Sequence, residues 1–134
     1  MAYIDQFNVK GVASGIGAFI VLYLLYTFLI NSLIGTVSII EKIQPIITFG
    51  GYLVWLASGY FAAFFSKKAG ILNGAITGVL TPIIMVMYMV IGFGSLEGIQ
   101  ETVKSHGLYW LFTGFILCGI GGLMWDIQKR LIKK

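Results

Sequence analysis

The sequence predicts an all-α integral membrane protein with four membrane-spanning helices. Hydrophobic residues make up 58% of the 134 residues and charged residues only 10%, whereas an average soluble domain contains roughly 25% charged residues. Four apolar runs each exceed the roughly 18 residues that indicate a membrane helix. We therefore expect a single membrane domain over residues 1–134, folded as a four-helix bundle.

Short polar breaks set the expected span boundaries. The second span follows the polar residues between Glu41 and Pro45, and only the Ser66–Ala69 turn separates it from the third span. Because that turn is so short, we expect the second and third spans to be antiparallel neighbours. The four spans are expected at about 11–34, 46–65, 70–93 and 108–127.

The segment at about 95–105, before the fourth span, has two interpretations. Leu96, Ile99 and Val103 recur at the helical spacing i, i+3 and i+7, with polar residues on the other faces. This pattern is typical of an amphipathic helix that lies on the membrane surface. A solvated loop is the alternative, and the sequence leaves both open.

The basic residues indicate how the chain is oriented. Seven of the nine fall on the side shared by both termini and the middle loop, and only Lys42 and Lys104 fall on the other side. Cytoplasmic loops carry an excess of Lys and Arg, so we expect a multi-pass protein of the cell membrane with both termini in the cytoplasm. The candidate topology determinants and lipid contacts are Lys67, Lys68, Lys129, Arg130, Lys133 and Lys134.

The absence of certain residue types argues against several functions. No Asp, Glu, Lys, Arg or His lies in the core of a predicted span, where proton relays and ion pathways place an ionisable residue. Cys118 is the only cysteine, and His106 has no cluster of metal ligands around it. The sequence shows no nucleophile–base pair, so it predicts no enzyme, no cofactor and no metal site. The basic residues lack a base-stacking platform, which argues against a nucleic-acid partner.

Small residues at regular spacing dominate the spans. Glycine contributes 18 residues, about twice its usual share of roughly 7%. In the third span glycine recurs every fourth position, and residues four apart share a helix face. Such faces permit close backbone approach in lipid, and we expect the third span to pack against small residues of the second. The helix-packing candidates are Gly70, Gly74, Gly78, Ser58, Gly59, Ala62, Ala63, Gly114, Cys118 and Gly122.

Neutral polar residues within the spans also have two interpretations. They can form hydrogen bonds between helices, or they can line a pore for a small neutral solute. The candidates are Asn31, Trp55, Asn73, Thr77 and Thr81. Pro82 is expected to kink the third span, with Thr77 or Thr81 bonding the carbonyl that the proline frees.

The stretch Gly50–Leu80 resembles certain uncharacterised small four-span membrane proteins of archaea and Gram-positive bacteria. The matching features are a glycine-rich span with Gly59, the basic turn Lys67-Lys68, and the Asn73-Gly74-Ala75 opening of the next span, which continues to Gly78. The resemblance covers about a quarter of the chain and implies the four-span fold. It implies no activity, because these families carry none that can be transferred.

The sequence therefore favours a small non-catalytic membrane protein with glycine-mediated helix packing. Its expected partners are the lipid bilayer and either a second copy of itself, in a homo-oligomer, or another membrane protein, as an accessory subunit. The alternative is a channel or facilitator for a small neutral or weakly charged solute.

Overall fold

A computed structural model describes residues 7–33, 40–93 and 96–132 of the chain. These residues form four helices and no strand: α1 (Val9–Leu33), α2 (Ile40–Ser66), α3 (Gly70–Phe93) and α4 (Leu96–Ile132). Each helix is long and apolar enough to cross a membrane. The predicted all-α fold with four candidate membrane helices is confirmed.

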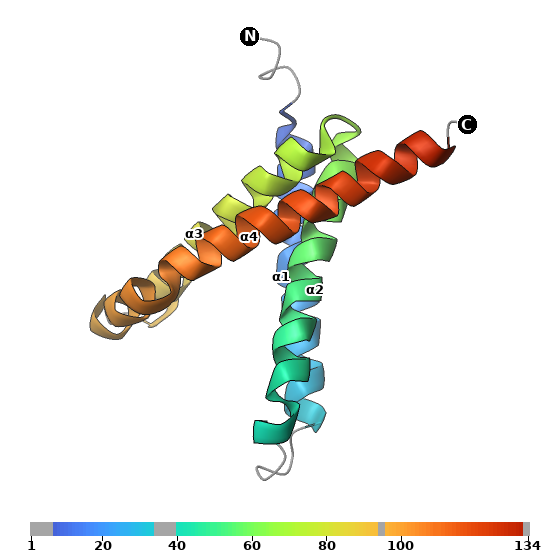
Figure 1. The fold of residues 1–134 in the computed structure, drawn as a ribbon. Coiled ribbons are helices and arrows are strands. Elements are labelled where there is room, and N and C mark those ends of the chain that lie inside the picture. Colours follow the sequence, from blue (N-terminus) through green and yellow to red (C-terminus); the bar gives the residue numbers. More distant parts are fainter. Residues whose placement is uncertain (1–6, 34–39, 94–95, 133–134) are drawn as a thin grey trace.

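The four helices form two antiparallel hairpins that cross one another (Figure 1). One hairpin consists of α1 and α2, and the other of α3 and α4. Helix α2 packs against all three other helices, whereas α1 and α4 have almost no contact. Away from the crossing the two hairpins diverge, so the molecule is more open than a bundle of parallel rods.

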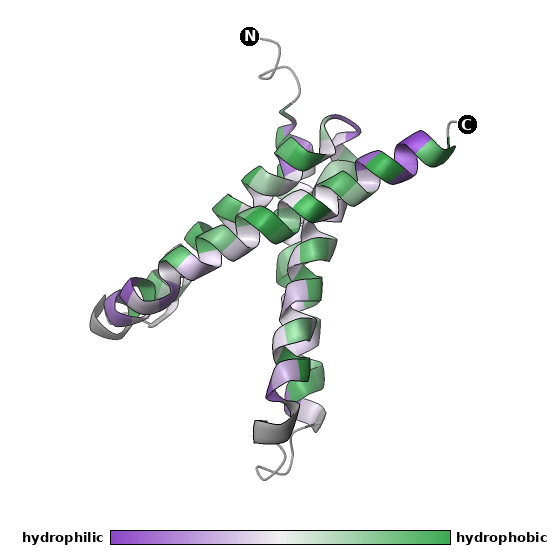
Figure 2. Cartoon of the chain, in the orientation of Figure 1, coloured by the Kyte–Doolittle hydropathy of each residue, from purple (hydrophilic) through white to green (hydrophobic). Residues whose placement is uncertain are grey.

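The start of α1, the turn between α2 and α3, and the end of α4 lie at one end of the molecule, in the upper part of Figure 1. The hydrophilic residues gather toward the helix ends, while the middle of each helix is largely apolar (Figure 2). This distribution is the one expected of helices that cross hydrocarbon and end in water.

The core is small and unusually polar. The largest fully buried side chains are Asn73, Thr77, Thr81, Cys118 and Ser58. Many large hydrophobic side chains are exposed instead, among them Phe28 at 70% and Ile91 at 81%. In water this arrangement would be unfavourable, but in a bilayer the lipid tails surround the apolar side chains at no cost.

Two helix starts differ from the sequence prediction. Helix α2 begins at Ile40 rather than at 46, and Pro45 lies inside it. Proline removes the hydrogen bond of its own N–H and crowds the carbonyl four residues earlier, and because Pro45 is near the start of α2 both effects are confined to the first turns.

Helix α4 begins at Leu96 rather than at 108. The segment predicted as a separate interfacial helix or loop at about 95–105 is continuous with the fourth span from Leu96 onward, and residue 95 lies outside the described part. No proline interrupts the segment, and its two glycines, Gly98 and Gly107, each cost only about 1 kcal/mol in a helix interior.

Candidate functional site

The closest helix contact lies between α3 and α4 and is built from small residues. Gly70, Gly74 and Gly78 of α3 face Gly122, Cys118 and Gly114 of α4 in antiparallel order. We call these six residues the α3–α4 seam. A methyl group added to any of its five glycines would overlap backbone atoms of the facing helix. At Gly114 the methyl group would also overlap the ring of Trp55. Only glycine allows the two backbones to approach so closely.

The seam glycines point their Cα hydrogens at carbonyl oxygens of the opposite helix. Gly78 and Gly114 face each other's carbonyls reciprocally, and Gly70 and Gly122 do the same two turns away. Between these pairs, Gly74 faces the carbonyl of Cys118. Repeated Cα–H···O contacts of this kind recur at close helix–helix interfaces and add a small attraction to the packing.

Cys118 is the residue at which α2 joins the seam. A methyl group on Gly59 of α2 would overlap the Cys118 backbone, and the Cys118 thiol donates a hydrogen bond to the carbonyl of Trp55, with 3.0 Å between sulfur and oxygen. On the next turn of α4, Gly121 packs against the carbonyl of Leu56. The lone cysteine is therefore completely buried where three helices meet.

The expected pairing of the glycine row in α3 with α2 is wrong. The atoms nearest to Gly70, Gly74 and Gly78 belong to α4. Spacing shows which residues share a helix face but not which helix covers that face, and α4 carries a row of small residues with the same four-residue spacing.

Two of the other predicted small residues of α2, Ser58 and Ala62, lie at the contact with α1. The Ser58 hydroxyl donates to the carbonyl of Gly15 at 2.8 Å, and a methyl group on Gly15 would overlap the Ala62 side chain. Ala63 is also fully buried. The small residues of α2 thus contact two other helices. Ser58 and Ala62 contact α1, and Gly59 contacts α4.

The polar row of α3 forms a buried column beside the seam. Asn73, Thr77 and Thr81 are exposed by no more than 1%. The hydroxyl of Thr77 donates to the Asn73 carbonyl at 2.8 Å, and that of Thr81 donates to the Thr77 carbonyl at 2.7 Å. Each hydroxyl is satisfied within its own helix, as buried polar groups in lipid must be.

The threonines do not bond the carbonyl that Pro82 frees. That carbonyl belongs to Gly78, four residues earlier, and it faces Gly114 across the seam. The expectation that Thr77 or Thr81 would cover it is therefore wrong, because the Thr77 hydroxyl bonds the Asn73 carbonyl and the Thr81 hydroxyl bonds the Thr77 carbonyl.

The polar column ends at a junction that the sequence analysis did not identify. Asn8 caps α1, with its side-chain oxygen accepting from the backbone N–H groups of Lys10 and Gly11. Its backbone N–H donates to the Asn73 side-chain oxygen at 3.0 Å, and its side-chain amide donates to the Ser66 carbonyl at 3.2 Å. Asparagine directly before an apolar run is a recognisable N-cap, but the contacts with α2 and α3 have no sequence signal.

Asp126 is a second residue that the sequence analysis left unassigned. Its carboxylate accepts from the backbone N–H of Gly70 at 2.9 Å and of Ile71 at 3.4 Å. An acidic side chain of α4 thus caps the start of α3, where unpaired N–H groups and the helix dipole favour negative charge. The contact also ties the ends of the two seam helices together.

The predicted basic residues lie at the same end as this cap. Lys67 follows α2 in a left-handed conformation with φ of 55°, and its carbonyl accepts from the Lys129 ammonium at 3.0 Å. Lys68 lies in the same turn, and Arg130 in the last turn of α4. Lys133 and Lys134 lie outside the described residues.

Of the five residues proposed as a pore lining, Asn73, Thr77 and Thr81 lie together in the buried column of α3, whereas Asn31 lies on α1 and Trp55 on α2. Asn31 is exposed near the end of α1, far along the chain from the buried column of α3. Trp55 packs against the ring of Phe19, with 4.5 Å between ring centres, and against Gly114. Trp55 also lines a small cavity of about 150 Å³ together with Pro82 and Trp110.

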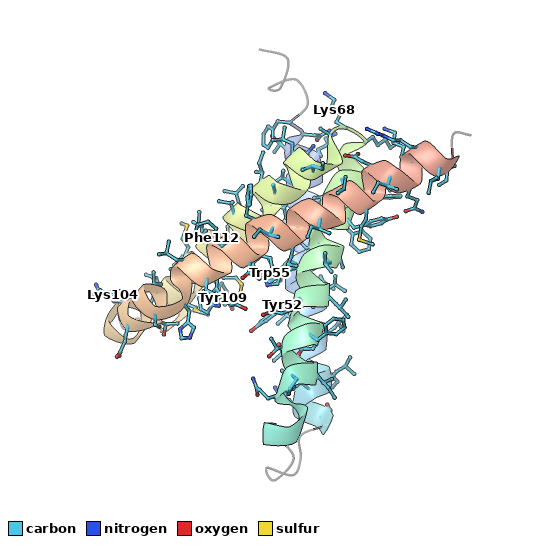
Figure 3. All side chains as sticks on the ribbon, in the orientation of Figure 1. Tyr52, Trp55, Lys68, Lys104, Tyr109 and Phe112 are labelled. Carbon is cyan, nitrogen blue, oxygen red and sulfur yellow. The ribbon has the colours of Figure 1, made fainter. Side chains whose placement is uncertain are left out.

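An apolar cleft opens where the hairpins diverge. A cavity of about 370 Å³ lies between α1 and α3, lined by residues that include Phe19, Tyr23 and Met85. On the α2–α4 side, the hydroxyls of Tyr52 and Tyr109 form a hydrogen bond of 2.5 Å, and Figure 3 shows both side chains in the angle between the hairpins. The cleft suits hydrocarbon rather than a polar solute.

Within the described part of the chain, no three His, Cys, Asp or Glu side chains gather as metal ligands would. Comparison with protein-family models, with curated proteins and with solved structures found no match. The resemblance of Gly50–Leu80 to small four-span proteins therefore stays a prediction.

The seam predicts a position-dependent effect of glycine substitution within one helix. Gly78→Ala should destabilise the protein by about 1–3 kcal/mol, the usual cost of overpacking, because the new methyl group overlaps the Gly114 carbonyl. Gly92→Ala is the matched control, since a methyl group there meets no atom within 4 Å. Unfolding of both variants in mixed detergent micelles measures the difference. Equal stability of the two would contradict the seam.

The cap predicts a smaller electrostatic effect. Asp126→Asn should lower the stability by about 0.5–1 kcal/mol, the typical value of a charge at a helix terminus, and the loss should shrink at high salt. Glu101→Gln, an exposed acid near the start of the same helix, serves as control and should have little effect. The measurement is thermal unfolding in a neutral detergent at two ionic strengths. A loss that does not depend on salt would show that the carboxylate charge is not what matters.

Proposed function

We propose that this chain is a small non-catalytic membrane protein that acts through contacts with other membrane proteins, as a homo-oligomer or as an accessory subunit. Its glycine residues and Ser58 hold its own helices together. Its contacts with a partner then involve the lipid-facing surface of the two hairpins.

The observation that carries this proposal is the hydrogen bonding of the buried polar side chains. Ser58, Thr77 and Thr81 are at most 1% exposed, and each hydroxyl donates to a backbone carbonyl. A solute pathway needs polar groups that face a shared space, and these groups face helix backbone instead. Their arrangement supports a packing role over a pore.

The contacts of the glycines support the same proposal and restrict where a partner can bind. The seam glycines face the other helices of the same chain, whereas Gly17, Gly51 and Gly92 have no atom within 4 Å of an added methyl group. A partner helix that approaches closely would therefore do so at α1, α2 or the far end of α3, and not at the seam.

Location in the cell membrane with both termini in the cytoplasm is part of the proposal. Two observations support this orientation. Most Lys and Arg residues fall on one predicted side of the membrane, and basic residues gather at the end of the molecule where α1 begins and α4 ends (Figure 1). Positively charged segments at membrane boundaries are retained on the cytoplasmic side.

The first test is to extract the tagged full chain with its surrounding lipid by a copolymer and to determine the mass of the particle's proteins. We expect either a fixed number of copies or a second protein in constant ratio. A single copy accompanied only by lipid would contradict the proposal.

The second test distinguishes packing from a pore. In a Cys118→Ala background, Thr77→Cys and Thr81→Cys should not react with a membrane-impermeant thiol reagent, because both positions are buried between helices. Ser105→Cys, at an exposed position of α4, is the positive control and should react. Labelling of Thr77→Cys at a rate close to the control would favour the channel alternative.

A further inference from the structure

Five basic residues from three separate segments gather at one end of the molecule. Lys10 lies in the first turn of α1, Lys67 and Lys68 in the turn between α2 and α3, and Lys129 and Arg130 in the last turn of α4. Figure 1 places these three segments at the same end, and Figure 3 shows Lys68 pointing outward from it. We call these five residues the basic end.

The fold holds the basic end together. The Lys129 ammonium donates to the Lys67 carbonyl and so fixes the end of α4 beside the α2–α3 turn. Asn8 connects the start of α1 to the same turn through the Ser66 carbonyl. The three cationic segments therefore form one surface instead of three independent ones.

Among the described residues, one acidic side chain lies near these five cations. Of the acidic residues in the described part of the chain, Glu41, Glu97 and Glu101 belong to the opposite ends of α2 and α4, and only Asp126 lies near the basic end. The Asp126 carboxylate already accepts from the backbone N–H groups of Gly70 and Ile71. The surface thus has a clear excess of positive charge.

The basic end also lies where a bilayer would place its headgroups. Trp125, one helical turn before Lys129, packs edge-on against Tyr60 and Phe64, and aromatic clusters of this kind mark the membrane–water interface. Beyond them, Leu131 and Ile132 are 68% and 72% exposed beside the cations. Apolar and basic side chains on one exposed helix end are typical of segments that lie in the interface.

We propose that the basic end binds the phosphate headgroups of anionic phospholipids in the leaflet that it faces. The positive charge favours a ligand that carries phosphate. The exposed apolar side chains of Leu131 and Ile132 favour a lipid over an acidic protein in water, because only the lipid would cover them. This inference goes beyond the proposed function and does not depend on the oligomeric state.

The test compares lipid preference in nanodiscs that contain the full chain and a mixture of phosphatidylglycerol and phosphatidylcholine. Spin-labelled analogues of the two lipids report which one is bound at the protein surface. The wild-type chain should prefer phosphatidylglycerol, and Lys67→Gln/Lys68→Gln should lower the preference by about fivefold for each lysine removed. The preference should also fall as salt is added, since salt screens exposed charges.

The matched control removes the same two charges from the other side of the chain. Lys42→Gln/Lys104→Gln should retain the preference of the wild type, and Lys67→Arg/Lys68→Arg should retain it because the charge is kept. Circular dichroism and the elution volume confirm that each variant is folded. Equal preference for the two lipids in the wild type, or an equal loss in the control, would overturn the proposal.

A competition experiment addresses the other sources of negative charge. Inorganic phosphate and a soluble polyglutamate peptide are added to nanodiscs that contain the protein. Neither should displace the labelled phosphatidylglycerol at physiological salt. Displacement by polyglutamate at micromolar concentration would identify the basic end as a surface for an acidic protein and overturn the lipid assignment.

Discussion

The close approach of α3 and α4 is the constraint on which the rest of the structure depends. Gly70, Gly74 and Gly78 leave one face of α3 without side chains, and the matching row of α4 lets the two backbones touch over about two turns. Lipid supplies no hydrophobic force between helices, so close contact over a long interface is what holds them. The seam also orients Cys118 toward α2, and α2 in turn positions α1 through Ser58.

The second constraint is that hydrocarbon cannot satisfy a polar group. A backbone or side-chain donor left without a partner in hydrocarbon is energetically costly, and among the described residues the buried Trp125 Nε1 is one such donor. The threonines of α3 find their partners within their own helix, and Ser58 finds its partner across the α1–α2 contact. The most buried side chains are thus polar, while many large apolar side chains face outward.

The two ends of the molecule differ as a consequence. At the basic end, the Asn8 junction and the Asp126 cap connect all four helices by directional hydrogen bonds. Toward the opposite ends the hairpins separate and leave the apolar cleft between α1 and α3 (Figure 1). Hydrogen bonds therefore connect the helices near the charged surface, whereas the two hairpins are separated farther into the lipid. This difference places the phosphate-binding surface on the more rigid part of the fold.

Much of this architecture follows from the sequence alone. Apolar length determines the number of helices, because each span needs about 20 residues to cross the hydrocarbon. The four-residue spacing of Gly70, Gly74 and Gly78 indicates a face for close packing, since that spacing returns to the same side of a helix. The start of α3 at Gly70 was also predicted, because the Lys67-Lys68 turn interrupts the apolar run.

Only the tertiary structure decided which faces meet. The glycine row of α3 is compatible in spacing with small residues of both α2 and α4, and the choice of α4 depends on how all four helices pack at once. The roles of Asn8 and Asp126 likewise arise from residues that are 65 and 56 positions from their partners. A local sequence pattern shows which residues lie on each face of a helix. Which helix packs against that face depends on how all four helices pack together, and a local pattern does not include that information.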